Sequence, residues 1–470
     1  MSSDLTHMSL VDVAQAIRDG EVSSREVTEA CIARIEQHAP QLNCFISFDA
    51  QQGLREADAA DAMRAAGKPM GLLHGVPLAH KDMYYRKGIV TTCGSKIRSD
   101  FVPDCTATAL TRLSAEGALH LGGLNMSEFA SSPTGHNSHF GAARNPWNTD
   151  YITCGSSSGS GAATAGRLVF GALGSDTGGS IRLPATACGL VGIKPTQTRV
   201  SRYGAMGLSF SLDNVGPLTR TVRDCARMLG IIAGHDPLDA TSSRRAVTDY
   251  EAATLNSDIR GLRIGVPSNY YDDVHDEVAS ALEESLAVLE SLGAIRIPIT
   301  VPFHEHLAAL GNIISGTESA TLHGAWLRER PQDYGPQVRA RLEMGLSYSA
   351  TQYLRAIQAR PGIIREFVKQ VFSKCDVLFA PGIPVPLPTI KETDLEDSQG
   401  FAQMLAQISR CTRPFNYLAL PGLSLPAGFS SNGLPVGLQL IGRPFAEQTL
   451  FRAGAAYEHA SDWTMRAPQL

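Results

Sequence analysis

Residues 154–182 read C-G-S-S-S-G-S-G-A-A-T-A-G-R-L-V-F-G-A-L-G-S-D-T-G-G-S-I-R and contain two clusters of glycine and serine. Glycine allows a backbone to turn sharply and to approach a ligand closely. Each cluster leads into an apolar or helix-compatible run, so its serines would lie at the ends of packed elements. We therefore expect the rest of the chain to position these serines for chemistry.

The composition is that of a large folded protein. The chain has 470 residues, of which 43% are hydrophobic and 19% charged, which excludes disorder over most of its length. The formal net charge is −5 and no block of like charges occurs. We expect neither a nucleic acid nor a membrane as partner, and a small neutral substrate instead.

The cysteines and the N-terminus indicate the cellular compartment in which we expect the protein. Nine cysteines occur without any C-x-x-C pair, a pattern typical of buried thiols under reducing conditions. The opening M-S-S-D-L-T-H-M has no basic or apolar signal region, and no later apolar run is long enough to cross a bilayer. The sequence therefore predicts a soluble cytoplasmic protein.

Hydrophobic periodicity predicts alternating helices and strands. Segments 1–70 and 303–372 read as helical, with helices expected over residues 10–19, 25–37 and 51–66 in the first of them. We expect the second, a helical excursion away from the sheet, to wall the substrate pocket. A further helix is expected over residues 219–233. Strands and helices alternate through residues 71–235 and return over 375–470. This pattern predicts an α/β fold with helices on both faces of a sheet, and no linker divides it, so one domain over residues 1–470 is favoured.

Two interpretations of the glycine–serine stretch conflict with its context. Gly159-Ser160-Gly161 partly matches a dinucleotide-binding loop, and Ser157 is the centre of a G-x-S-x-G nucleophile elbow. Both motifs need a strand directly before them, whereas N-P-W-N-T-D-Y-I-T precedes this one. The elbow also needs a downstream histidine, and the candidates are His235, His323 and His459.

His136 and His139 lack neighbouring ligands, so we expect no metal site there.

A third interpretation combines both serine clusters with Lys81, in the run G-V-P-L-A-H-K-D. Cleavage of an amide needs a nucleophile, a proton for the leaving amine and hydrogen-bond donors for the oxyanion. A lysine that burial keeps neutral can accept the proton of a serine, and a second serine can carry it onward. The turn T-G-G-S can direct backbone N–H groups to one point. The candidate oxyanion donors are the N–H groups of Thr177, Gly178, Gly179 and Ser180.

Three segments, S-S-S-G-S-G-A-A, G-S-D-T-G-G-S-I-R-L-P-A and C-G-L-V-G-I-K-P-T, resemble the amidase signature family of serine hydrolases. The resemblance spans nearly the whole chain. It implies one α/β/α sandwich on a mixed sheet, no cofactor and no metal. It also implies that Ser180 is the nucleophile, Ser156 the bridging serine on a cis peptide bond and Lys81 the base. Four further residues are candidates for supporting the substrate loop: Ser131, Ser132, Asp176 and Arg182.

Segment 333–356 looks more like the stand-alone hydrolases of this family than like the A subunit of glutamyl-tRNA amidotransferase. We therefore expect a stand-alone hydrolase of small or aryl-bearing amides, with carbamates and esters as further substrates. Its partners would be small molecules only, and a homodimer stays open. The alternative is the glutamine-hydrolysing A subunit, which works only with partner chains.

Overall fold

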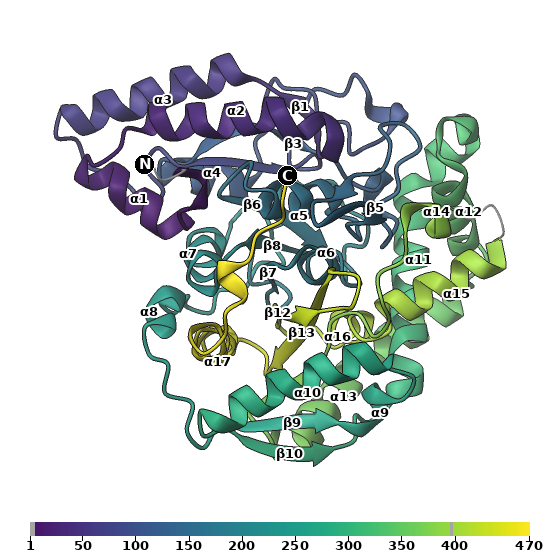
Figure 1. The fold of residues 1–470 in the computed structure, drawn as a ribbon. Helices are drawn as coiled ribbons and strands as arrows, with labels where there is room; N and C mark the ends of the chain where they lie inside the picture. The colour runs from purple at the N-terminus through teal and green to yellow at the C-terminus, as the bar shows by residue number, and fades with distance from the viewer. Residues whose placement is uncertain (1–4, 395–397) are drawn as a thin grey trace.

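The computed structural model describes residues 5–394 and 398–470. Its centre is a sheet of eight strands (Figure 1), parallel from β10 to β11 and antiparallel elsewhere. In spatial order the strands are β10 (Ile295–Ile299), β9 (Arg263–Pro267), β11 (Val377–Pro381), β13 (Pro435–Gly442), β12 (Gly422–Phe429), β7 (Val191–Lys194), β8 (Asn214–Thr219) and β6 (Gly171–Asp176).

Helices cover this sheet in layers. One layer consists of α7 (Val222–Ile232), α10 (Asp276–Ser291) and α17 (Glu447–His459), which pack on β8, β7, β12 and β13, together with α8 (Tyr250–Thr254), which packs on α7 and α17. A second pair, α5 (Ser158–Ala165) and α6 (Arg182–Cys188), contacts the same strands and β6. Every residue of β13 is buried, which requires cover on both faces. The predicted α/β sandwich on a mixed sheet is confirmed.

The N-terminal portion is helical, as predicted. It contains α1 (Leu10–Asp19), α2 (Ser24–Leu42) and α3 (Ala50–Ala65), which lie together at the edge of the molecule (Figure 1). The Ser23 hydroxyl accepts a hydrogen bond from the N–H of Glu26, whose carboxylate in turn accepts one from the N–H of Ser23. This capping box fixes the start of α2.

A small sheet carries Lys81. It has the order β1 (Phe45–Phe48), β3 (Leu119–Leu124) and β2 (Pro77–Lys81), with β2 parallel to β3. All five residues of β2 are buried, so the strand delivers its last side chain into the interior rather than to solvent. A hairpin of β4 (Arg144–Asn145) and β5 (Asn148–Ile152) leads into the serine-rich loop.

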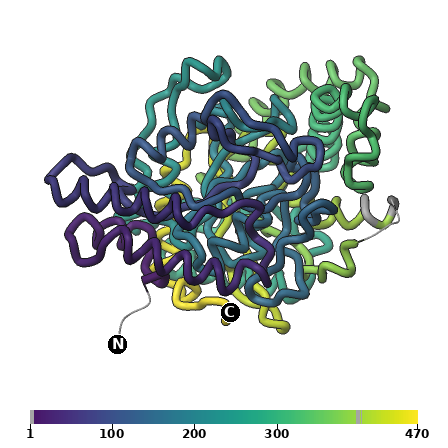
Figure 2. Tube along the Cα trace, turned by 90° about the horizontal axis from the view of Figure 1, so that it is seen from above, coloured from purple at the N-terminus to yellow at the C-terminus, as the bar shows by residue number. Residues whose placement is uncertain are grey.

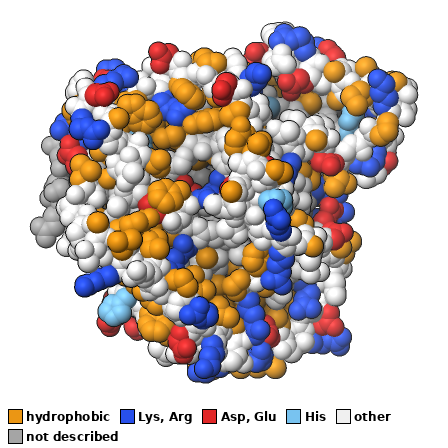
Figure 3. Space-filling view, turned by 180° about the vertical axis from the view of Figure 1, so that it is seen from behind, with side chains coloured by type: hydrophobic (Ala, Val, Ile, Leu, Met, Phe, Trp, Pro, Cys, Tyr) orange, Lys and Arg blue, Asp and Glu red, His pale blue; other side chains and the backbone are white. Residues whose placement is uncertain are grey.

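The predicted helical excursion is present. It consists of α11 (His304–Glu329), α12 (Pro336–Gly345) and α13 (Ala350–Phe372). In Figures 1 and 2, α11 and α12 lie on the side of the molecule away from the N-terminal helices. The face in Figure 3, opposite to that of Figure 1, is hollowed near its centre, with hydrophobic and basic side chains around the hollow.

Several elements were missed or misplaced by the sequence patterns. The run N-V-G-P-L-T was not expected to be a strand, because glycine and proline weaken strands. It nevertheless forms β8, since β6 and β7 pair with it on its two sides. The helix expected over residues 219–233 begins at Val222, after the N-cap Thr221. The remaining helices are α4 (Thr108–Ala115), α9 (Ser268–Tyr271), α14 (Ile390–Thr393), α15 (Ser398–Ser409) and α16 (Arg413–Tyr417).

One hydrophobic cluster contains side chains from Leu10 near the start of the chain to Trp463 near its end. The organisation as a single domain, with its boundaries near residues 70, 235, 303 and 375, stays a prediction. Within the described residues, no helix has both the length and the apolar character that a membrane crossing requires.

The central strand β13 tests the importance of the sheet core. Leu440 is 0% exposed, so Leu440→Ala should lower the free energy of unfolding by about 2–5 kcal/mol through lost burial and a cavity. Leu255→Ala, at a side chain that is 69% exposed, is the control and should change it by less than about 0.5 kcal/mol. Urea unfolding measures both; equal effects would contradict the assigned core.

Candidate active site

A lysine and two serines meet in the interior. The Nζ atom of Lys81 lies 2.6 Å from the Oγ of Ser156 and 2.9 Å from the Oγ of Ser175. None of the three residues is more than 3% exposed. Strand β2 brings Lys81, strand β6 brings Ser175, and the loop before α5 brings Ser156. The structure thus joins residues that are 75 and 94 positions apart.

The loop before α5 has an unusual backbone and packs closely against its neighbours. The peptide bond between Gly155 and Ser156 is cis, and the carbonyl of Ser156 accepts a hydrogen bond from the N–H of Ser127. Helix α5 is completely buried and built of small residues. A side chain at Gly159 would collide with the backbone of Cys44 and Asn125, so glycine is what allows α5 to approach this closely.

Burial changes the chemistry of Lys81. It lowers the pKa of the Lys81 amine from 10.5 to about 7, although the nearby carboxylates of Asp213 and Asp176 favour the charged form. An amine with this pKa is substantially neutral near pH 7 and then has a lone pair that can accept a proton. The environment therefore gives Lys81 the property that a general base needs.

Ser180 lies in the turn that follows β6. Its side chain is partly exposed, and in the described part of the chain its hydroxyl has no hydrogen-bond partner, Ser156 included. The N–H of Gly179 donates to the Asp176 carboxylate over 2.8 Å and is therefore not free to bind an oxyanion. No hydrogen bond within the described residues occupies the N–H groups of Thr177, Gly178 and Ser180. Three of the four candidate donors stay available.

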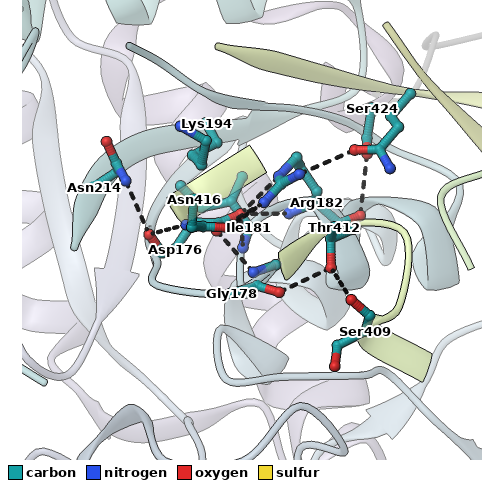
Figure 4. Close-up of polar contacts among 12 residues, drawn as sticks. Asp176, Gly178, Ile181, Arg182, Lys194, Asn214, Ser409, Thr412, Asn416 and Ser424 are labelled. Atoms are coloured by element: carbon teal, nitrogen blue, oxygen red, sulfur yellow. Dashed lines mark hydrogen bonds and ion pairs between the residues drawn. The ribbon is translucent and has the colours of Figure 1, made fainter. Parts of the chain in front are cut away.

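Asp176 and Arg182 form a buried ion pair around this turn. The Arg182 Nε lies 3.1 Å from the Asp176 carboxylate, and both side chains are 0% exposed. Asn416 contacts both partners (Figure 4). The side-chain oxygen of Gln439 also accepts a hydrogen bond from Arg182. Burial alone would raise the pKa of Asp176, but Arg182, Lys194 and Asn416 hold that pKa at about 2. The pair is a structural clamp on the turn and does not face solvent.

Some residues at this site carried no signal in the sequence. Asp213 accepts a hydrogen bond of 2.5 Å from the Thr177 hydroxyl, but it lies 36 positions away in an unremarkable segment. Ser175 lies inside the recognised motif G-S-D-T-G-G-S, and strand alternation places it on the same face of β6 as Leu173. The sequence could therefore have indicated the contact of Ser175 with Lys81, but it could not have indicated the contact of Asp213 with Thr177.

The loop around Ser131 and Ser132 lies against the serine-rich loop. The carbonyl of Ser132 accepts from the Ser127 hydroxyl over 3.0 Å, and the carbonyl of Ser131 accepts from the Arg341 guanidinium over 2.7 Å. Both serines are buried, and the Ser132 hydroxyl contacts the hydroxyl and the N–H of Thr134. Within the described residues, no hydrogen bond joins the hydroxyl of Ser131 or Ser132 to Lys81 or Ser156.

The histidines lie apart from these serines. Ser157 is 0% exposed, and its hydroxyl contacts the backbone of Ser175 and no histidine within the described residues. His323 instead contacts the hydroxyl of Tyr334, and His235 contacts Ser242. The arrangement is not that of a nucleophile elbow. The other histidine pair is used in local contacts, His136 with Thr393 and His139 with Glu128.

A cavity of about 290 Å³ reaches Ser175. Its wall comes from β6, from β8 and from the loops around residues 202–210 and 238–240. These loops were not singled out in the sequence, where the helical excursion and the loop at Ser131 were expected to shape the pocket. Loop residues that converge from distant segments carry no local pattern that would reveal them.

A mixed sandwich that buries a lysine–serine pair beside a glycine turn defines a class of enzyme that acts on C–N amide bonds. The family model described as Amidase matches residues 26–451. This chain belongs to the amidase family, as its signature motifs implied.

Its relatives within the family include subunits of an amidotransferase. The chain is 43% identical to the A subunit of the glutamyl-tRNA(Gln) amidotransferase of Roseiflexus sp. (strain RS-1), over 99% of both chains. The structure of the corresponding A subunit from Thermotoga maritima has a TM-score of 0.83 at 31% identity, covering 98% and 96% of the two chains. A structure from a vestigial protein complex, related to the origins of an s-triazine catabolic enzyme, has a TM-score of 0.89 at 34% identity, covering 97% and 99%.

These relatives correct two predictions from the sequence. The prediction of a stand-alone hydrolase with small molecules as its only partners is wrong, since the full-length relatives are named as one subunit of an enzyme for glutamyl-tRNA(Gln). Segment 333–356 forms α12 and the start of α13, and most of its side chains are exposed or half-buried. Net charge describes the whole molecule and does not exclude a local surface, or another subunit, that meets a nucleic acid.

The buried ion pair gives a stability prediction. Arg182→Met should lower the free energy of unfolding by about 3–5 kcal/mol, because it leaves the carboxylate of Asp176 buried without its partner. Arg339→Met is the matched control: Arg339 pairs with Glu343 on the surface, and its loss should cost about 0–1 kcal/mol. Urea unfolding of both variants measures the difference. A loss no larger than that of the control would contradict the assigned clamp.

Proposed function

We propose that this chain is the glutamine-hydrolysing A subunit of a tRNA-dependent amidotransferase. The observation that carries the proposal is the 43% identity, over 99% of both chains, to the A subunit from Roseiflexus sp. (strain RS-1). The contact between Lys81 and Ser156 supports it, since the release of ammonia from glutamine is the cleavage of a C–N amide bond. In this function the chain works beside other subunits.

Ser180 is the proposed nucleophile. Its Oγ attacks the carboxamide carbon of glutamine, the C–N bond breaks, and a γ-glutamyl ester and ammonia result. Water then attacks the ester carbon, which releases glutamate and restores the serine hydroxyl. The position of Ser180, partly exposed at the end of a glycine turn, supports this role.

Lys81 and Ser156 are proposed to move the proton. The neutral amine of Lys81 accepts the proton of Ser156, which in turn accepts that of Ser180 during the attack. The same route, run backwards, delivers a proton to the leaving nitrogen, which is a poor leaving group without it. The distance of 2.6 Å between Nζ and Oγ suits direct transfer.

The oxyanion is proposed to bind to the backbone N–H groups of Thr177, Gly178 and Ser180. Gly179 is omitted because its N–H already donates to Asp176. Preorganised donors of this kind are worth the most where water is excluded, and the clamp of Asp176 and Arg182 keeps the turn in one conformation.

The pH dependence tests Lys81. Since the neutral amine is the active form and its pKa is about 7, kcat/KM for glutamine should fall about tenfold per pH unit below 7 and level off above it. Lys81→Met should reduce kcat by at least about a thousandfold while the protein stays folded. Initial rates of ammonia release between pH 5 and 9 measure this. A rate that rises as the pH falls would contradict a neutral base.

The proposed function itself is tested by reconstitution. The chain, purified together with the other subunits, should release ammonia from glutamine and amidate glutamyl-tRNA(Gln), and Ser180→Ala should abolish both. Mass spectrometry after treatment with a fluorophosphonate should find the adduct on Ser180. Ammonia release from anilides but not from glutamine, with the partner subunits present, would contradict the proposal.

A further inference from the structure

Strand β6, which contains Ser175, is the last strand of the large sheet. It pairs with β8 along one edge, and no strand of the described residues pairs with it along the other. All six residues of β6 are buried, so the backbone groups of its open edge are also shielded from water. Buried N–H and C=O groups need hydrogen-bond partners, and at this edge side chains have to supply them.

Side chains from two neighbouring elements act as these partners. At the start of α5, the Ser157 hydroxyl contacts both backbone groups of Ser175, and the Ser160 hydroxyl donates to the carbonyl of Leu173 over 3.1 Å. From β2, the Nδ1 of His80 accepts a hydrogen bond of 3.0 Å from the N–H of Leu173. The open edge of β6 is therefore joined to the strand that carries the candidate base.

Two residues on either side of Lys81 in the chain contact β6. His80 directly precedes Lys81, and Tyr84 follows it by three positions. Their partners lie in the run Leu173–Ser175 of β6. The first residue of this run donates its N–H to His80, and the carbonyl of the second accepts a hydrogen bond of 2.6 Å from the Tyr84 hydroxyl. The hydroxyl of the third lies 2.9 Å from the Lys81 Nζ, so the contact of the base is flanked by two hydrogen bonds.

These side chains are the link between the two strands near Lys81. Strands β2 and β6 belong to different sheets, so no ladder of backbone hydrogen bonds holds them together. Within the described residues, a backbone hydrogen bond joins the two segments only at the far end of β2, where the N–H of Phe170 donates to the carbonyl of Pro77 over 3.3 Å. Near Lys81, the distance between the strands therefore depends on His80 and Tyr84.

His80 acts as a neutral ring. Its Nδ1 accepts the backbone N–H of Leu173, so this nitrogen carries no proton. Burial, together with the charge of Arg86, lowers the pKa of His80 to about 3. The ring of His120 lies 5.0 Å from that of His80, and burial lowers the pKa of His120 as well. Asp82 and Arg86 border a small cavity together with both rings. Over the pH range of an activity assay, the acceptor on His80 therefore does not change.

The closeness of the two strands determines the charge of Lys81. Its amine contacts the hydroxyls of Ser156 and Ser175, and the effect of desolvation outweighs that of the carboxylates of Asp213 and Asp176. A wider gap between β2 and β6 would let water reach the amine. Water would favour the charged form of the amine, which cannot accept a proton.

We propose that His80 and Tyr84 are positioning residues for Lys81: their hydrogen bonds to β6 hold its amine against Ser156 and Ser175 and keep water out of this contact. Within the described residues, neither side chain has a hydrogen bond to Ser156 or Ser180, so both act through Lys81. The inference rests on the proposed role of Lys81 as the base, but it does not depend on which amide is hydrolysed.

The pH dependence of labelling at Ser180 tests this role without turnover of glutamine. A neutral fluorophosphonate labels the purified chain, and the labelling rate constant of the wild type should rise with pH and level off above an inflection near 7. Tyr84→Phe removes one hydroxyl, and His80→Leu leaves the N–H of Leu173 without its acceptor. Each should move the inflection upward by roughly 0.5–1 pH unit, so that labelling below it slows about three- to tenfold and recovers at high pH.

His80→Asn is the rescue variant. The Oδ1 of asparagine is bonded to Cγ, as is the Nδ1 of histidine, so it can accept a hydrogen bond from the same N–H of Leu173. The inflection of His80→Asn should therefore return to that of the wild type. A loss of stability by itself would not be reversed in this way.

Two buried side chains with equivalent backbone hydrogen bonds elsewhere provide the controls. His74 is 3% exposed, as is His80, and its Nε2 lies 2.9 Å from the carbonyl of Ala60. Tyr417 is 0% exposed, and its hydroxyl donates to the carbonyl of Ala356 over 3.0 Å. His74→Leu and Tyr417→Phe should lower the stability measured by urea unfolding but leave the inflection at the wild-type pH.

The outcomes separate this inference from the proposed function. An inflection that stays at the wild-type pH in both Tyr84→Phe and His80→Leu would overturn the positioning role, and so would an equal shift in the controls. If His80→Leu does not fold, Tyr84→Phe decides alone. A shift confined to these two variants, without release of ammonia from glutamine by the reconstituted complex, would support the positioning role and contradict only the proposed function.

Discussion

A buried carboxylate, that of Asp176, determines the geometry of the candidate active site. It accepts hydrogen bonds from the backbone of the turn, from Arg182 at the start of α6 and from Asn416 in α16, so two segments far apart in the chain meet on one side chain. A charge in this position is stable only with its partners in place. The turn that presents Ser180 therefore depends on α16, which lies outside the motif that contains the serine, as well as on Arg182 within that motif.

Lys81 and Asp176 are both buried, but their ionisation differs. Lys81 is surrounded by hydroxyl groups and by carboxylates too distant to pair with it, so desolvation dominates and its amine becomes neutral. Asp176 is equally buried, but the guanidinium of Arg182 is in direct contact and keeps it ionised. The same interior thus keeps one carboxylate ionised through its ion pair and favours the neutral form of one amine.

The arginines near the turn differ in how the protein balances their charge. Arg182 is neutralised by the protein itself, whereas Arg413 and Arg341 have no acidic partner within the described residues and contact only neutral acceptors. Helix α16 takes part in both arrangements: Asn416 donates a hydrogen bond to Asp176 of the buried ion pair, and Arg413 lies beside Gly178 of the turn. One short helix therefore contributes both to the buried ion pair and to the surroundings of the turn.

The sequence by itself determined the fold class, the helical portions and the family. Helix starts such as those at Ser9 and Ser23 follow local capping chemistry, which neighbouring residues decide. The motifs around Ser156 and Ser180 are local in the same sense. Their catalytic roles stay predictions, as does the single domain.

Only the tertiary structure decided what lies around these motifs. Strand β8 exists because two neighbours pair with it, against its own glycine and proline. The contacts of Asp213, Asn416 and Arg413 join segments that are far apart in the chain, and no periodicity or spacing encodes such contacts. The N–H of Gly179 was lost as an oxyanion donor for the same reason, since the direction of an N–H depends on the folded turn and not on residue type.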